Sequence, residues 1–108
     1  MARYLIQVSY TSESWATQVA NPTNRLEAVA NMLAPAGIKF VDSYYAFGEF
    51  DMVVIADGPD NVSTAAGVIA VAAGGAVSKL QTTPLLTPEE GLAAITKAGS
   101  IGYSPAVS

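Results

Sequence analysis

Hydrophobic and polar side chains alternate at the start of the chain, which is the pattern of a β-strand with one buried face. The predicted strand runs from Arg3 to Thr11. Its inward-facing side chains would be Tyr4, Ile6, Val8 and Tyr10. The polar stretch from Ser12 to Asn21, which carries the only tryptophan, Trp15, is predicted to be a loop.

A helical period follows this polar stretch. Asn24 and Glu27 have the spacing of a capping box at a helix start. Apolar residues then recur at intervals of three and four: Leu26, Val29, Ala30 and Leu33. Pro35 and Gly37 end this first predicted helix.

A second helix is predicted before the glycine pair Gly74-Gly75, which ends it. Asp60 or Asn61 can cap its first turn, because both side chains accept a hydrogen bond from a backbone N–H two or three residues later. One face of this helix is expected to be the inner one: Val62, Ala66, Ile69 and Ala73.

Three further strands are predicted from β-branched and aromatic residues, over Ile38 to Phe47, Phe50 to Ala56 and Ala76 to Thr83. Pro84 is expected to stop the last of them. The first two are separated by little more than Gly48, so they should form a hairpin, with Gly48 at a positive φ in its turn.

The clearest helix start lies near the C-terminus. Thr87 is followed by Pro88 and, at the third helical position, by Glu90, which together form a capping-box signature. Leu92 and Ile95 would give this short third helix its inner face.

The order of these elements is βαββαβ followed by a short helix. Two right-handed crossovers and a central hairpin predict an α+β, ferredoxin-like fold: a four-stranded antiparallel sheet with helices on one face. Residues 1–98 are predicted to form a single domain and residues 99–108 a C-terminal tail.

The third predicted strand is apolar on both faces, with Phe50, Met52, Val54 and Ala56 on one side and Val53 and Ile55 on the other. The helices can cover only one of these faces. Either a loop or the tail covers the other face, or a second subunit's sheet does. The second interpretation is favoured, because an uncovered face would exceed the apolar patch that a monomer usually exposes. A homodimer or higher even-numbered oligomer is therefore predicted.

Composition excludes several kinds of chemistry. The 108 residues include no cysteine and no histidine, which excludes a thiol nucleophile, a Ser-His-Asp triad, a disulfide and an ordinary zinc site. The formal net charge is -4, and the 5 Lys and Arg residues are too few for the basic patch that nucleic acid or an anionic membrane requires.

No cofactor is expected, and haem is disfavoured because only a tyrosine could serve as its axial ligand. Without a recognisable signal or spanning segment, a cytoplasmic location is expected.

A small polar cluster is predicted on the otherwise apolar sheet. Asp51 could act as a base or accept a hydrogen bond from a ligand, and Lys79 could neutralise an anion. The structural alternative is an ion pair between strand ends or subunits, which is the commoner arrangement. In either case Asp51 should be fixed by a partner: a cation, Lys79 before Arg3, or two or more N–H donors.

Aromatic side chains form the second group of candidates. Tyr45 could serve as an acid or base through its phenol, and Thr82 could supply a hydroxyl to a ligand. The remaining candidates could bind an apolar or aromatic ligand: Tyr10, Trp15, Tyr44 and Phe47. The structural alternative is that they are core, interface or loop-anchoring residues, and that Thr82 simply favours a strand.

Several short motifs together resemble the GYD-domain family. The stretch Gly48-Glu49-Phe50-Asp51 is similar to a Gly-x-Tyr/Phe-Asp motif. The opening Tyr4–Thr11, the helix start Pro59-Asp60-Asn61 and the run Thr82–Glu90 match in order and spacing. The resemblance extends from the first strand to the third helix. Phe50 stands where the family's name has tyrosine, so no phenol hydroxyl is available at that position.

This resemblance implies membership of the dimeric α/β-barrel superfamily, whose small ferredoxin-like domains pair through their sheets. That superfamily includes cofactor-free monooxygenases, isomerases, haem-handling enzymes and ligand-sensing modules. The resemblance therefore implies a fold and an assembly but no particular activity.

Three functions are compatible with these observations. The first is a homo-oligomeric small-molecule-binding or regulatory domain, and the second is a cofactor-free monooxygenase- or isomerase-like enzyme acting on an apolar or aromatic metabolite. A purely structural assembly module is the third. A pocket between sheet and helices with Asp51 or Lys79 at its wall would distinguish the second from the first.

Overall fold

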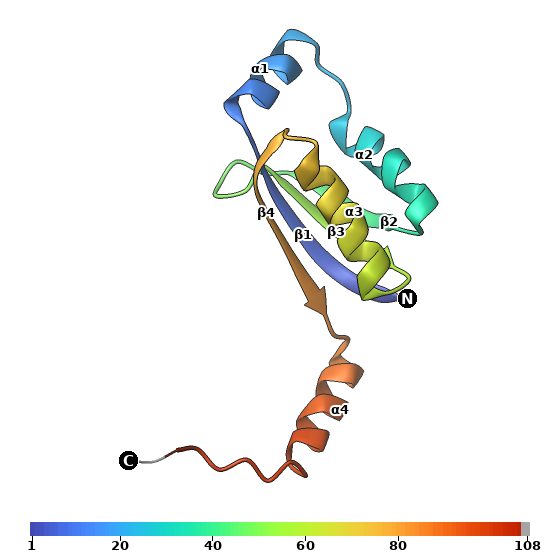
Figure 1. Ribbon diagram of the computed structural model, residues 1–108, viewed down its shortest axis with the longest axis vertical. Coiled ribbons are helices and arrows are strands. Elements are labelled where there is room, and N and C mark those ends of the chain that lie inside the picture. The colour runs from blue at the N-terminus through green and yellow to red at the C-terminus, as the bar shows by residue number, and fades with distance from the viewer. Residues whose placement is uncertain (107–108) are drawn as a thin grey trace.

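A computed structural model of the chain describes residues 1–106, so the last two residues of the predicted tail, 107–108, lie outside the described residues. Within the described part, four strands form one antiparallel sheet and two helices cover one of its faces (Figure 1). This is the predicted α+β, ferredoxin-like fold with one additional helix. The elements are β1 (Ala2–Tyr10), α1 (Ser12–Ala20), α2 (Arg25–Leu33), the 3-10 turn η1 (Ala34–Ala36), β2 (Lys39–Tyr45), β3 (Met52–Gly58), α3 (Asn61–Ala73), β4 (Val77–Leu85) and α4 (Pro88–Ala98).

The strands lie in the order β2-β3-β1-β4, and each neighbouring pair is antiparallel. The hairpin predicted around Gly48 joins β2 to β3, and the backbone N–H of Ala46 donates to the carbonyl of Asp51 across it at 2.8 Å. Every second residue of β1 and β3 points at the helices, as the alternation predicts. The other residues of the two strands form an open face that no helix of this chain covers.

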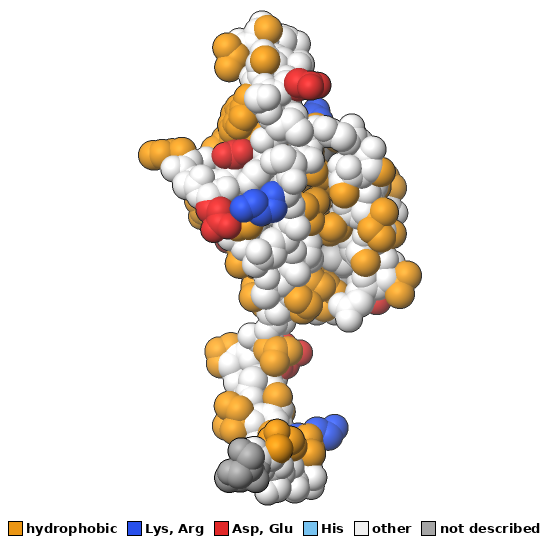
Figure 2. Space-filling view, turned by 60° about the vertical axis from the view of Figure 1, so that its left-hand side comes forward, with side chains coloured by type: hydrophobic (Ala, Val, Ile, Leu, Met, Phe, Trp, Pro, Cys, Tyr) orange, Lys and Arg blue, Asp and Glu red, His pale blue; other side chains and the backbone are white. Residues whose placement is uncertain are grey.

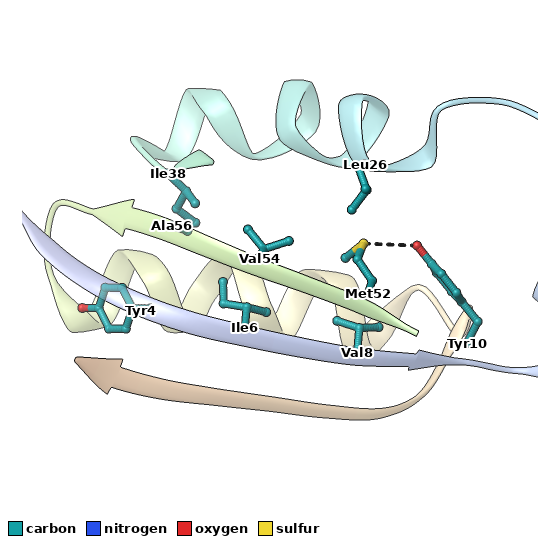
Figure 3. Close-up of a cluster of buried hydrophobic side chains, with 9 residues drawn as sticks. All are labelled: Tyr4, Ile6, Val8, Tyr10, Leu26, Ile38, Met52, Val54 and Ala56. Carbon is teal, nitrogen blue, oxygen red and sulfur yellow. Dashed lines mark hydrogen bonds between the residues drawn. The ribbon is translucent and has the colours of Figure 1, made fainter. Parts of the chain in front are cut away.

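The core lies between this sheet and helices α2 and α3 (Figure 3). Val8 and Val54 are among the most deeply buried side chains, at 1% and 0% exposed. The buried cluster contains Tyr4, Ile6, Val8, Tyr10, Leu26, Ile38, Met52, Val54 and Ala56. Burial of these side chains is the main favourable term for a sheet that has one face covered.

Three helices begin at the residues that the sequence predicts. The Asn24 side chain accepts a hydrogen bond from the Glu27 N–H at 3.1 Å, and the Asp60 carboxylate accepts one from the Ser63 N–H at 2.7 Å. At α4 the capping box is complete, because Thr87 and Glu90 each accept a hydrogen bond from the other's backbone N–H. Each cap pairs backbone N–H groups that the helix itself cannot pair.

The predicted loop from Ser12 to Asn21 is wrong, because most of it is helix α1. Thr11 caps this helix by accepting from the Ser14 N–H at 3.0 Å, and Glu13 lies in its first turn. None of its residues is buried. A helix without a buried face shows no hydrophobic period, which is why the pattern did not reveal it.

The predicted inner face of α3 is also wrong. Val62 and Ile69 are 81% and 65% exposed, whereas Thr64 and Gly67 are buried. A Cβ on Gly67 would collide with the side chain of Ile38, so the helix approaches its neighbour through its smallest residue. In a helix rich in alanine, close approach rather than side-chain size decides which face is buried.

Two local predictions about strands need correction. Gly48 does not have a positive φ, since among residues 1–106 the glycines with positive φ are Gly37, Gly75 and Gly102. Pro84 does not stop β4, which continues to Leu85 and pairs Pro84 with Tyr4. A proline is tolerated there because β4 is an edge strand, where one N–H needs no partner in the sheet.

Helix α4 projects beyond the end of β4, away from the sheet and the other helices (Figure 1). The radius of gyration is 17.4 Å, whereas a compact domain of about 100 residues has about 13 Å. Leu92 and Ile95, the predicted inner face, are 65% and 72% exposed, so this prediction is wrong within a single chain. Hydrophobic side chains stand on the surface of this arm (Figure 2).

Within residues 1–106, each helix falls short of the length and hydrophobicity that crossing a bilayer requires.

Candidate functional site

The predicted site residues Tyr10, Trp15 and Asp51 meet where β1 ends. One carboxylate oxygen of Asp51 accepts hydrogen bonds from the Tyr10 backbone N–H at 2.8 Å and from the Trp15 indole Nε1 at 3.3 Å. The Asp51 backbone N–H donates to the carbonyl of Val8 at 2.8 Å. Asp51 thus ties the β2–β3 loop to the end of β1 and to helix α1.

The prediction that Asp51 is fixed by N–H donors is confirmed, and the prediction of a cationic partner is wrong. Lys79 instead pairs with Glu49 at 3.0 Å and lies 5.0 Å from the centre of the Phe50 ring. Arg3 pairs with Asp57 at 2.8 Å. Both cations lie on the open face of the sheet, whereas the Asp51 carboxylate turns toward the end of β1.

Tyr10 connects this cluster to the interior. Its ring meets that of Trp15 edge-to-face, with centroids 5.2 Å apart. Its hydroxyl donates to the thioether sulfur of Met52 at 3.3 Å, as the dashed line in Figure 3 shows. The side chain is 7% exposed, and this burial raises the pKa of the Tyr10 phenol above its usual range. The phenol therefore stays protonated near neutral pH and acts as a donor.

A cavity of about 280 Å³ lies over the helix-covered face of the sheet, between α2 and α3. Tyr10 and Arg25 are its polar side chains, and Tyr10 is the only predicted site residue that lines it. Most of its wall is apolar and comes from five elements, with Val8, Val29, Leu33, Met52, Val71 and Val77 among the contributors. The wall is therefore suited to an apolar molecule that carries few polar groups.

A polar groove of about 400 Å³ adjoins this cavity. Thr11, Ser14 and Gln18 contribute to its wall beside α1, and Arg25 belongs to the walls of both hollows. Among residues 1–106, the ion pairs join Arg3 to Asp57 and Lys79 to Glu49, so the Arg25 guanidinium takes part in neither. Arg25 therefore brings an unpaired positive charge to the point where groove and cavity meet.

The sequence model of the GYD domain matches residues 4–95, which is most of the chain. This chain belongs to the GYD-domain family. The family resemblance of the Gly48–Asp51 motif and its neighbours is thereby confirmed.

The fold of this GYD domain is similar to that of two solved structures. The crystal structure of MtbAldR matches with a TM-score of 0.58 and 14% identity, over 80% of this chain and 53% of that chain. The crystal structure of FFRP-DM1 matches with a TM-score of 0.54 and 14% identity, over 80% of this chain and 100% of that chain. This chain therefore spans about half the length of MtbAldR, and at such identity the likeness shows the fold alone. No curated protein sequence matches this chain.

The other predicted site residues of the GYD domain are scattered. Tyr44 is 62% exposed and pairs with Val53 on the open side of the sheet, and Phe47 is fully exposed in the β2–β3 loop. Tyr45 accepts a hydrogen bond from the Arg25 backbone N–H at 3.2 Å. Thr82 does not line the cavity beside Tyr10. It lines a separate hollow of about 280 Å³ on the covered face, near Tyr4 and Asn61. Tyr44 and Tyr45 both line an open hollow of about 720 Å³ beside α2, whereas Tyr10 lines the smaller apolar cavity. The aromatic candidates therefore do not all converge on one pocket.

Sequence reasoning missed Arg25 and Met52 as members of this site. Arg25 directly follows the helix cap Asn24, a position that pattern analysis reads as the solvated start of a helix. Met52 is an inward residue of an apolar strand and looks like core. No group of three or more metal-ligating side chains occurs among the described residues, so the site offers no metal centre there.

Proposed function

We propose that this GYD domain is a homo-oligomeric module that binds a small apolar or aromatic molecule and has a regulatory rather than a catalytic role. The cavity between α2, α3 and the sheet is the observation that carries this proposal. Its volume of about 280 Å³ is near the lower end of ligand pockets, which span roughly 300–1,000 Å³. A small metabolite fits this volume better than an extended cofactor.

The positions of Asp51 and Lys79 support binding over catalysis. Both lie outside the lining of this cavity, and both have partners within the protein. The remaining phenol at the wall, Tyr10, is kept protonated by burial and is a poor base near neutral pH. A cofactor-free enzyme would need a base that touches the ligand, so this alternative has less support.

The open face of the sheet supports the homo-oligomeric part of the proposal. Leu5 lies between Ile55 on β3 and Thr83 on β4, at the centre of that face. The ion pairs Arg3–Asp57 and Lys79–Glu49 stand toward its two ends. The pair Gln7–Gln81 beside Leu5 is polar but uncharged, so the charges of this face stand at its rim. Depletion of charge at the centre is typical of a protein interface. A second copy of this chain presents the same surface and could cover it through a two-fold axis.

The ligand-binding part is tested by filling the cavity. Thermal unfolding of the full chain is followed with a panel of small neutral, acidic and basic aromatic compounds. Binding to the folded state raises the midpoint of unfolding. We expect at least one class to do so, and we expect Val71→Phe, which fills the cavity, to abolish the shift. Val62→Phe on the exposed side of the same helix is the matched control and should retain it. A shift that survives Val71→Phe, or none with any compound, contradicts the proposal.

A further inference from the structure

We propose that the cavity binds a small apolar or aromatic carboxylic acid, with its carboxylate held by Arg25 and the Tyr10 hydroxyl. This inference rests on the proposed ligand-binding function and specifies the chemistry of the ligand. It depends on three features of the cavity: an unpaired guanidinium, a poorly satisfied buried hydroxyl and an otherwise apolar wall.

The first feature is the charge of Arg25. Its backbone N–H donates a hydrogen bond to the Tyr45 hydroxyl oxygen, but its guanidinium joins neither ion pair found among residues 1–106. The side chain is only partly exposed and belongs to the wall of the cavity. A guanidinium presents several donors in a planar fork that matches a carboxylate, and charge-assisted hydrogen bonds of this kind are strong.

The second feature is the hydroxyl of Tyr10. It lies inside the wall, and its acceptor is the sulfur of Met52 at 3.3 Å. A thioether is a weak acceptor, so a buried hydroxyl bound to it gains by donating to a charged oxygen instead. Tyr10 and Arg25 both line the cavity and are its polar side chains. The two donors can therefore serve one carboxylate in the cavity.

The third feature is the remaining wall. Val29, Leu33 and Val71 come from the two helices, and Val8 from the sheet below them. Such a wall accepts a hydrocarbon or aromatic body and excludes a second charged group, because a buried charge without a partner is costly. Glu13 is the acidic residue in the wall of the adjoining groove, so a dicarboxylate extending into the groove would be repelled. A monocarboxylate with an apolar body fits both the donors Arg25 and Tyr10 and the apolar wall.

The test compares an acid with its neutral counterpart. Calorimetric titration of the full chain uses 3-phenylpropionate and 3-phenylpropan-1-ol, which differ in the charged group. We expect the acid to bind at least about tenfold more tightly, the contribution of one charge-assisted hydrogen bond. Arg25→Gln should remove this preference, and Tyr10→Phe, which keeps the ring, should weaken the acid several-fold. Lys97→Gln on α4 removes a charge far from the cavity and should leave both affinities unchanged.

Equal affinity for the acid and the alcohol, or an acid affinity that Arg25→Gln does not change, overturns this inference. If the alcohol then binds and Val71→Phe abolishes its binding, the proposed ligand-binding function still stands with a neutral ligand. If neither compound binds at millimolar concentration, the inference fails, and the wider compound panel decides the proposed function separately.

Discussion

Asp51 accepts two hydrogen bonds, and one of the donors is the backbone N–H of the buried residue Tyr10. Asp51→Ala leaves this N–H without an acceptor, and an unsatisfied buried donor costs about 1–3 kcal/mol. We expect the free energy of unfolding to fall by that amount in urea denaturation. The Trp15 fluorescence should also shift to longer wavelength, because the indole loses its acceptor and α1 loosens.

Asp51→Asn provides the comparison for this prediction. The amide keeps one oxygen that can accept from Tyr10, so its loss of stability should be clearly smaller than that of Asp51→Ala. Equal losses for the two variants would show that the charge of Asp51, rather than its acceptor, stabilises the loop.

Gly58 ends β3 against helix α3, and a Cβ there would collide with the hydroxyl oxygen of Thr64 and lie 3.3 Å from the Tyr4 ring. Overpacking of this kind costs about 1–3 kcal/mol. We therefore expect Gly58→Ala to lower the free energy of unfolding by that amount. Adding Thr64→Ala should recover part of the loss, because it removes the nearest colliding atom.

Gly48→Ala is the matched glycine control. No atom lies within 4 Å of the Cβ that it would add, and the backbone φ at Gly48 is not positive. Its effect on unfolding should stay within about 0.5 kcal/mol, as for other surface substitutions. A loss as large as that of Gly58→Ala would contradict the packing argument.

Helix α3 depends on a charged cap whose strength changes with pH. Hydrogen bonds from Ser63, first from its backbone N–H, lower the pKa of the Asp60 carboxyl below its ordinary value of 3.8. A pKa that is lower in the folded state means that the stabilisation is complete above the unfolded pKa. It is lost as the pH falls through the folded pKa. We expect Asp60→Asn, which keeps an acceptor, to reduce the loss of stability between neutral pH and about pH 2.

The difference in pH-dependent stability between the wild type and Asp60→Asn isolates the contribution of this cap. Other carboxyls with lowered pKa values, such as Asp57 and Glu90, titrate in both proteins. The measurement is the midpoint of urea denaturation at a series of pH values. Parallel pH curves for the wild type and Asp60→Asn would contradict the prediction.

The helices show what the sequence can and cannot predict. The caps Asn24, Asp60 and Thr87 act through neighbours in the sequence, so their short motifs were sufficient. Helix α1 was missed because its stability comes from the Thr11 cap and from Trp15 docking on Tyr10, a contact between elements. Only the capping signal, Thr11 followed by the acidic Glu13, could have revealed it.

The candidate site was less predictable for the same reason. Tyr10 was identified from its type, but its place at a cavity wall depends on how α2 and α3 lie over the sheet. Asp51 and Glu49, the partner of Lys79, both lie in the β2–β3 loop. The partners of Asp51 and Lys79 therefore depend on where the side chains of this loop point, and the period of the strand does not extend into it. The role proposed for Arg25 depends on its guanidinium joining neither ion pair found among residues 1–106, which no local sequence pattern displays.

The open face of the sheet predicts the effect of a charge at its centre. Ile55 lies on that face, opposite Leu5, and is only half-buried in a single chain. A standard interface buries about 1,600 Å² and excludes unpaired charge from its centre. We expect wild-type protein to sediment as a dimer or larger even-numbered oligomer at micromolar concentration, and Ile55→Lys to sediment as a monomer.

Val62→Lys is the control for this prediction, since Val62 is 81% exposed on α3, away from the open face. It should sediment like the wild type. A wild-type protein that sediments as a single chain would contradict the proposed self-association, even if the cavity binds a ligand.

The projecting helix α4 adds a second expectation about assembly. Leu92 and Ile95 leave their own chain largely uncovered, at 65% and 72% exposure. If a second copy of this chain covers them, Leu92→Ser with Ile95→Ser should raise the dissociation constant of the oligomer. Circular dichroism of the variant should keep the native spectrum, because neither side chain packs in the core. An unchanged dissociation constant would place α4 outside the interface.

The two outer strands of the sheet limit how copies of the chain can meet. Pro84 stands in β4 at one edge and has no N–H to offer, so a further strand would find a gap in the hydrogen-bond ladder. At the other edge, β2 shifts its register between Phe40 and Asp42, an irregularity that also hinders the addition of a strand. The addition of strands from other copies is thus disfavoured at both edges of the sheet, so contacts between copies should form through its faces. A concentrated solution of this protein should therefore hold closed particles of fixed size and no fibres.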